Sequence, residues 1–213
     1  MNVDTERLAT EVAHYAHGRV PRDLRRRQVL NEAEQLFIER GYDGTSMDEV
    51  ASRVGVSKPV VYDLVGSKEQ LFHEVMTITA DELSSCIALA VAAEPDLRKR
   101  LDAGALAFFS FVIGHRAAWD AILSGDAAPV TTAVAQIRNR QAELVVSLLT
   151  DGAAQLQLQV DPVQTEALGH AITGAFEALA SWSQGHPELS PADLTALLTI
   201  LVGPGLAALR GER

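Results

Sequence analysis

Apolar residues recur along the chain at spacings of three and four positions, which is the period of an amphipathic α-helix. No stretch alternates between apolar and polar residues over the length of a strand, so the pattern predicts an all-α protein. Glycines and capping residues divide the pattern into about nine helices. The predicted helices span residues 24–40, 47–54, 57–65, 68–92, 96–114, 116–123, 127–150, 162–184 and 191–210.

The ends of these predicted helices carry capping chemistry. Thr45 and Ser46 are followed three residues later by acidic residues, and Ser67 is followed by Gln70, which is the spacing of a capping box. Asp161 and Ser190 each stand directly before a proline, so a capping oxygen precedes proline at the first helical position. Within the last helix, Pro204 predicts a kink or a break, because proline removes a backbone donor and clashes with the preceding turn.

The segment around residue 55 has the pattern of a helix-turn-helix. Ala51 supplies a small residue where a second helix crosses the first, and Gly55 tolerates the unusual φ angle that the turn requires. Val61 and Leu64 then direct the second helix back toward the core. This leaves five residues facing outward: Ser57, Lys58, Pro59, Tyr62 and Asp63.

Composition and charge narrow the class of protein. The 213 residues are 47% hydrophobic and include a single cysteine, Cys86, which we expect in a helix core. The chain has one cysteine and an acidic start, and its longest apolar runs, 103–114 and 197–209, are shorter than the ~20 residues of a bilayer span. These features predict a cytoplasmic protein without a membrane segment. The pattern contains no catalytic motif, and we expect no enzyme activity, metal or cofactor.

The charge is divided unevenly along the chain. A net charge of −10 by itself opposes nucleic-acid binding, because neutralising phosphates requires Lys and Arg. Residues 19–27, however, hold five arginines and one aspartate, while residues 81–213 hold 8 basic and 15 acidic residues. The arginines, among them Arg25, can reach a DNA groove or can simply be solvated, and the sequence leaves both readings open.

Residues 24–71 resemble the DNA-binding domain of the TetR family of transcriptional regulators. The matching residues are Ala33, Phe37, Gly41, Tyr42, Thr45, Ser46, Val50, Ala51, Gly55, Val56, Ser57, Val61, Tyr62 and residues 67–71. The resemblance implies a homodimeric repressor that a small hydrophobic effector releases from a near-palindromic operator in double-stranded DNA. It divides the chain into a tail (1–20), a helix-turn-helix domain (21–67) and an effector-binding and dimerisation domain (68–213).

The resemblance also implies roles for single residues. It places Thr45, Tyr62 and Lys68 on phosphates, and it places Lys58, Pro59 and Val60 near base edges. The candidate DNA-binding set is completed by Arg25, Ser46, Ser57 and Asp63.

Physical chemistry bears on the assignments of Lys58, Tyr62, Lys68 and Asp63. A recognition helix enters the major groove with its N-terminal part, and Lys58 lies in that part of the predicted helix. Tyr62 either contacts a phosphate or a thymine methyl group, or packs locally within the protein. Lys68 stands in a first helical turn, where the macrodipole disfavours a cation unless an anion is near. Asp63 either accepts from a cytosine amino group or has a local structural role. The family often has His and Phe directly after this position, whereas this chain has Leu and Val, so one polar phosphate contact is absent.

Aromatic residues gather in the C-terminal part. The three Phe residues between 108 and 111 cannot share one helical face, so at least one should point into a cavity or across a helix interface. We expect an apolar effector pocket here, with plain core packing as the alternative. The candidate ligand-binding residues are Phe108, Phe111, His115, Trp119 and Phe176.

The last two predicted helices, 162–184 and 191–210, have the composition of a dimer interface. Small residues repeat at helical spacing on the first, and leucines repeat on the second, including Leu194, Leu198 and Leu201. The resemblance implies a four-helix bundle formed with the same helices of a second subunit. A different class of function also stays open: a helical ligand-binding or dimerisation module that does not bind an operator.

Overall fold

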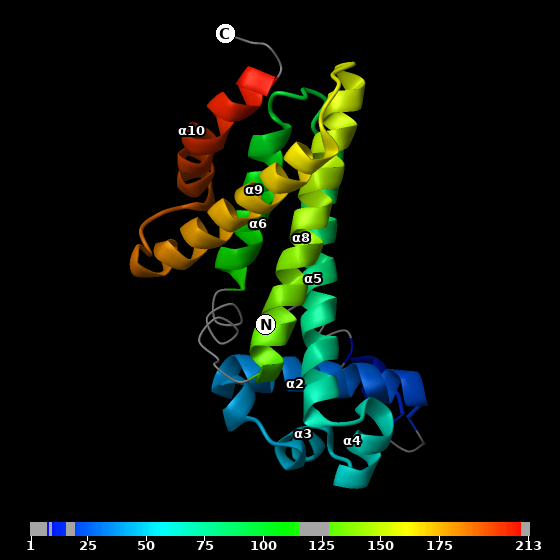
Figure 1. The fold of residues 1–213 in the computed structure, drawn as a ribbon. Helices are drawn as coiled ribbons and strands as arrows, with labels where there is room; N and C mark the ends of the chain where they lie inside the picture. The colour runs from blue at the N-terminus through cyan, green and yellow to red at the C-terminus, as the bar shows by residue number, and fades with distance from the viewer. Residues whose placement is uncertain (1–7, 9, 16–19, 116–127, 210–213) are drawn as a thin grey trace. The chain divides into compact units, whose positions relative to one another are not determined.

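Helices form the regular structure of the computed structural model, which describes residues 8, 10–15, 20–115 and 128–209 (Figure 1). This part of the chain contains no strand, and the all-α prediction is confirmed. The helices are α2 (Arg22–Gly44), α3 (Met47–Val54), α4 (Lys58–Val65), α5 (Lys68–Ala93), α6 (Arg100–Gly114), α8 (Ala128–Gln155), α9 (Pro162–Trp182) and α10 (Pro191–Leu209), with a short 3₁₀ helix, η1 (Ser183–Gly185).

The predicted caps are present at the helix starts except at Thr45, whose hydroxyl lies against the carbonyls of Leu36 and Gly41. The hydroxyl oxygen of Ser46 accepts a hydrogen bond from the backbone N–H of Glu49 at 3.2 Å, and the carboxylate of Asp161 accepts from the N–H of Gln164 at 2.9 Å. Ser67 and Gln70 cap one another, because the backbone N–H of each donates to the side-chain oxygen of the other. These bonds satisfy backbone donors that have no partner within the helix, so the local sequence defines where the helices begin.

Several predicted boundaries need correction. Helix α6 begins at Arg100 rather than at residue 96, because the preceding residues form a turn that the carboxylates of Glu94 and Asp96 cap. Helix α10 continues through Pro204, so the predicted break is wrong. Proline removes only one hydrogen bond there, and few further bonds depend on it so close to the helix end. The predicted helix 116–123 lies outside the described residues.

The chain forms two compact units. Unit 1 comprises Met1–Thr79 and Ala117–Val134, and unit 2 comprises Ala80–Arg116 and Ala135–Arg213. In unit 1 the cores of α2, α3 and α4 meet, with Val29, Leu36 and Val61 fully buried. The N-terminal region also contributes, because Leu8 is buried and Glu11 pairs with Arg27 at 3.3 Å.

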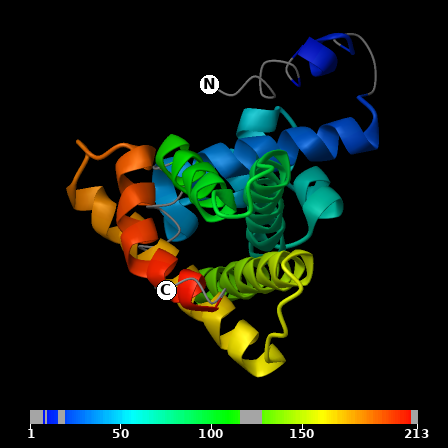
Figure 2. The same ribbon diagram turned by 90° about the horizontal axis from the view of Figure 1, so that it is seen from above.

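Unit 2 is built around an aromatic cluster. The rings of Phe108 and Phe109 in α6 contact the ring of Phe176 in α9, with centroids 4.8 and 5.5 Å apart. Helix α10 packs on both α6 and α9, as Figure 2 shows, with Leu194 and Leu198 fully buried. Cys86, in contrast, is exposed on α5, so the prediction of a core cysteine is wrong: the apolar stretch around it turns this position outward.

Helix α5 is long and apolar enough to cross a membrane, judged by length and composition alone. It has 26 residues and a mean hydropathy of 1.5 over its most apolar window. Several of its side chains, such as Leu71, Phe72 and Leu83, are buried against protein. Core helices of water-soluble proteins have the same properties, so α5 is weak evidence for a membrane segment.

Candidate DNA-binding surface and effector cavity

The turn between α3 and α4 has the backbone geometry that the sequence predicts. Gly55 adopts a left-handed conformation with φ +72°, and the N–H of Val56 donates to the carbonyl of Ala51 at 3.0 Å. The side chain of Ala51 is buried where the two helices meet. Glycine is favoured at this position because a Cβ atom disfavours the left-handed region.

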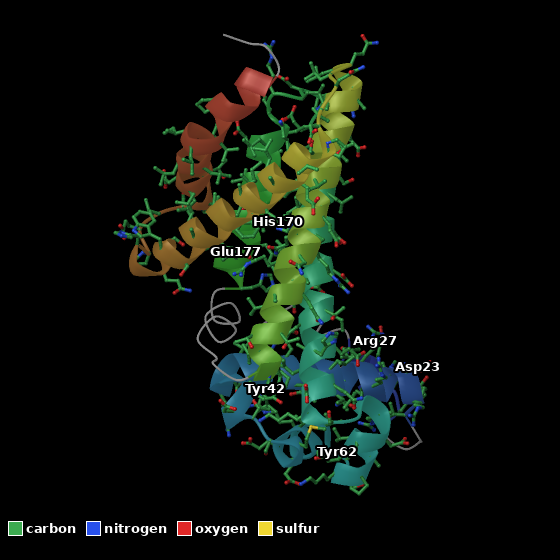
Figure 3. The ribbon with its side chains drawn as sticks, in the orientation of Figure 1. Asp23, Arg27, Tyr42, Tyr62, His170 and Glu177 are labelled. Carbon is green, nitrogen blue, oxygen red and sulfur yellow. The ribbon has the colours of Figure 1, made fainter. Side chains whose placement is uncertain are left out.

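Helix α4 has one buried and one exposed face. Val61, Leu64 and Val65 are buried in unit 1. The exposed residues at the start of the helix and along its outer face form what we call the α4 surface: Ser57, Lys58, Pro59, Val60, Tyr62 and Asp63. Tyr62, labelled in Figure 3, is 45% exposed, so it is not a core residue of this chain.

Both charged residues of the α4 surface have partners within unit 1. The ammonium of Lys58 lies 2.8 Å from the carboxylate of Asp48 in α3, and this hydrogen bond raises the pKa of Lys58. Asp63 forms an ion pair with Arg22, which also donates to the backbone carbonyl of Asp63 at 2.8 Å. Asp63 therefore links α4 to the start of α2, a contact that fits the local structural role named above as one of two alternatives.

The predicted DNA contacts outside the α4 surface differ in their environments. Ser46 is exposed at the start of α3. The ammonium of Lys68 lies 4.4 Å above the centre of the Tyr42 ring and 3.5 Å from the carbonyl of Asp43. Thr45 is only 3% exposed, and its hydroxyl lies within hydrogen-bonding distance of the carbonyl of Gly41 at 2.8 Å. The structure therefore does not bring Thr45 to the surface with the others.

The arginines of α2 make contacts that sequence reasoning missed. Arg25 donates to the carbonyl of Val54 at 3.3 Å, and Arg26 donates to the carbonyl of Leu64 at 3.2 Å and to the carboxylate of Glu74 at 2.7 Å. These bonds join α2 to the last turns of α3 and α4 and to α5. They satisfy carbonyl groups that helix ends leave without a partner, a role that sequence spacing does not reveal.

Unit 2 contains a cavity of about 610 Å³ with a mostly apolar lining. Phe108 and Phe176, two of the candidate ligand-binding residues, line it. Phe111 and His115 do not belong to the lining. Instead, the His115 ring stacks on Phe111, and its Nδ1 lies 2.8 Å from the carbonyl of Phe111 at the end of α6. Trp119 lies outside the described residues.

Much of the cavity wall comes from helices that were not singled out from sequence. Helix α5 contributes Ile87, Ala88 and Val91, while α8 contributes Leu148 and other apolar side chains. The apolar stripe of the predicted helix 127–150 was a signal for this wall, but such a stripe is equally typical of plain core packing.

Helices α9 and α10 expose large apolar side chains. Val163 is 74% exposed, Ile200 73% and Leu201 68%. The leucines of α10 do not all share this face, because Leu194 and Leu198 point into unit 2. An exposed apolar strip on two neighbouring helices is a common feature of protein interfaces.

Comparisons with known proteins agree with this geometry. Residues 29–75 match the family described as "Bacterial regulatory proteins, tetR family", and residues 97–203 match "Tetracyclin repressor-like, C-terminal domain". A crystal structure of a TetR-like transcriptional regulator from Rhodococcus sp. RHA1 is 30% identical, with a TM-score of 0.66, and the match covers 89% of this chain and 99% of that one.

Two curated relatives match over shorter stretches. The HTH-type transcriptional activator FasR of Mycolicibacterium smegmatis is 38% identical over 57% of this chain and 55% of its own length. The biofilm operon negative transcriptional regulator IcaR of Staphylococcus aureus is 31% identical over 29% of this chain and 33% of its own length. These relatives are named as regulators of transcription, in agreement with the expectation that the chain is a regulator and not an enzyme.

Proposed function

Because the chain belongs to the TetR family of bacterial transcriptional regulators, we propose that it is a homodimeric repressor that leaves its operator when a small hydrophobic effector binds. In this proposal residues 21–67 bind DNA, and residues 68–213 bind the effector and form the dimer. The protein acts in the cytoplasm, where its DNA is.

The observation that carries the proposal is the α4 surface at a helix-turn-helix corner. Lys58, Pro59 and Val60 stand at the N-terminal end of α4, the end of a recognition helix that meets base edges in the major groove. Tyr62, together with Ser57, lies exposed beside them for a phosphate or a thymine methyl group. Lys68 lies outside the α4 surface, and we propose that it contacts a phosphate of the DNA backbone.

Three of the expected DNA contacts receive a different role in this proposal. Thr45 is buried with its hydroxyl against backbone carbonyls, and Arg25 lies against the end of α3. We assign both to positioning the helices of unit 1. Ser46 caps α3 and is exposed, so it stays in the proposed interface, whereas Asp63 acts through its pairing with Arg22.

The proposed dimer uses the exposed apolar strip of α9 and α10. Small residues of α9, such as Ala167, Ala171 and Ala178, are exposed there and permit close helix approach. An isologous two-fold dimer places two recognition helices on successive major-groove faces, so the operator is a near-palindrome with half-sites about one helical turn or slightly more apart.

The effector site is the cavity of unit 2. Its volume lies within the range typical of small-molecule pockets, and its lining is mostly apolar with a few polar side chains. Named relatives include an activator and a negative regulator, so the sign of regulation is tested separately. A promoter–reporter fusion should show higher expression when the gene for this chain is deleted if it represses, and lower expression if it activates.

A band-shift assay with DNA from the protein's own promoter region tests the proposal. We expect a complex below micromolar protein that salt weakens and that unrelated DNA does not form. The alternative is a helical ligand-binding or dimerisation module without operator binding. It is favoured by the net charge of −10 and by the intramolecular pairing of Lys58, and it predicts no such complex.

A further inference from the structure

The wall of the unit 2 cavity includes a buried amide with incomplete hydrogen bonding. Gln141 of α8 lines the cavity and is only 5% exposed. Its Nε2 has no hydrogen-bond partner, and among the residues that the structure describes it is the only buried side-chain nitrogen or oxygen in that condition. An unpaired buried donor destabilises a fold, so such a group calls for an explanation.

Neighbouring polar groups of the wall already have partners within the protein. The hydroxyls of Thr165 and Thr173 lie 2.9 Å from the backbone carbonyls four residues earlier, of Asp161 just before α9 and of Gly169 within it. The Thr199 hydroxyl lies 2.6 Å from a carboxylate oxygen of Asp102. Arg100, the first residue of α6, donates to the side-chain oxygen of Gln155 at the end of α8, at 3.1 Å. Gln141 differs from these groups because its Nε2 has no partner among the described residues, although the residue belongs to the cavity wall.

We propose that Nε2 of Gln141 donates a hydrogen bond to an uncharged oxygen of the effector. The effector is then an apolar molecule that carries a carbonyl, ester or ether oxygen. This inference rests on the proposed function, because it takes the cavity to be the effector site.

The soft amide torsion of Gln141 and its apolar neighbours favour this ligand chemistry. The terminal torsion of a glutamine side chain is soft, so a small rotation turns the amide toward a bound molecule. Leu144 and Val145, one turn along α8 from Gln141, also line the cavity. A charged oxygen beside these side chains would lose its hydration, which costs more than burying a neutral acceptor, and the two cations of the wall, Arg98 and Arg100, come from the start of α6 and the residues before it rather than from α8.

Two probes of nearly identical shape isolate the hydrogen bond. In 2-acetylnaphthalene a carbonyl oxygen occupies the position that a methylene group occupies in 2-isopropenylnaphthalene. Titration calorimetry gives the ratio of their dissociation constants for the full-length wild type, for Gln141→Leu and for Thr173→Val. Thr173→Val is the matched control, because it removes a wall hydroxyl that already has a partner within α9.

We expect Gln141→Leu to shift the ratio about tenfold against the ketone, the loss typical of one buried hydrogen bond, while Thr173→Val leaves the ratio unchanged. An unchanged ratio in Gln141→Leu, with both probes binding, would overturn the role of Gln141 and leave the effector cavity standing. If neither probe bound the wild type, the inference and the apolar effector site would both fail. Should Gln141→Leu not fold, as judged by circular dichroism, Gln141→Met provides the same test.

Discussion

The ammonium of Lys58, at the first residue of α4, lies 2.8 Å from the carboxylate of Asp48 in α3. The two side chains are 47% and 68% exposed, so the pair stands in solvent and is weak. A phosphate or a guanine edge can therefore replace Asp48 as the partner of Lys58 at small cost. The pairing is compatible with a base-reading role for Lys58. In the absence of DNA, the carboxylate of Asp48 is the partner of the Lys58 ammonium.

Lys68 should act on DNA affinity without affecting sequence preference. We expect Lys68→Ala to weaken binding to all DNA sequences alike and to lower the slope of log K against log salt by about 1, as the loss of one phosphate contact does. Lys99→Ala, which removes the same charge from unit 2, is the control and should leave the slope unchanged. Fluorescence anisotropy at several salt concentrations measures both. Equal slopes for wild type and Lys68→Ala would remove Lys68 from the interface.

The dimer interface is tested by adding charge to the exposed strip of α9 and α10. Leu201→Glu should yield monomers, because a carboxylate at the centre of an apolar interface loses its hydration. Leu89→Glu is the matched control: Leu89 is 71% exposed, on α5, outside the proposed interface. Sedimentation velocity separates the two states. An intact dimer of Leu201→Glu would move the interface to another surface.

Filling the cavity should imitate the effector. Ala88 lines the cavity and belongs to α5, the helix that begins at Lys68 directly after the DNA-binding helices. We expect Ala88→Phe to weaken operator binding roughly tenfold, a usual size of coupling between two sites. Ala107→Phe makes the same change at a residue that does not line the cavity, and it should have a smaller effect. Full operator affinity in an Ala88→Phe variant that folds, dimerises and no longer binds 2-isopropenylnaphthalene would contradict this coupling.

The start of α10 gives a pH-dependent contribution to stability. The hydroxyl and the backbone N–H of Ser190 donate to the carboxylate of Asp193, and these hydrogen bonds lower the pKa of Asp193 below its ordinary value of 3.8. Since the folded pKa is the lower one, the stabilisation is present above the unfolded value and is lost as pH falls through the folded value. Asp193→Ala should therefore lower the melting temperature at neutral pH, and its difference from wild type should shrink below pH 3.8.

Glu82→Ala, which removes an exposed acid from the middle of α5, is the control for this measurement. It should leave the melting temperature nearly unchanged at neutral pH. A constant difference between Asp193→Ala and wild type across the acid range would show that the capping contact does not depend on the ionised carboxylate.

Features that depend on neighbouring residues were predictable from sequence. The cap at Ser46 and the left-handed Gly55 follow from residue types a few positions apart, and both are found. The pairing of Arg22 with Asp63 joins residues 41 positions apart, and no local rule relates them. For the same reason the sequence could not separate Phe108, which lines the cavity, from Phe111, which stacks on His115, because the rotation of α6 is set by its packing on α9 and α10.

The central claim is that this chain reads DNA sequence with the α4 surface, and selection of binding sites from a random double-stranded library tests it most directly. We expect the wild type to enrich a near-palindrome, and we expect Lys58→Ala to enrich a site that differs at the same position of each half-site. Enrichment of no common sequence by the folded, dimeric wild type would contradict the claim. An identical selected site for wild type and Lys58→Ala would instead remove Lys58 from the base edges.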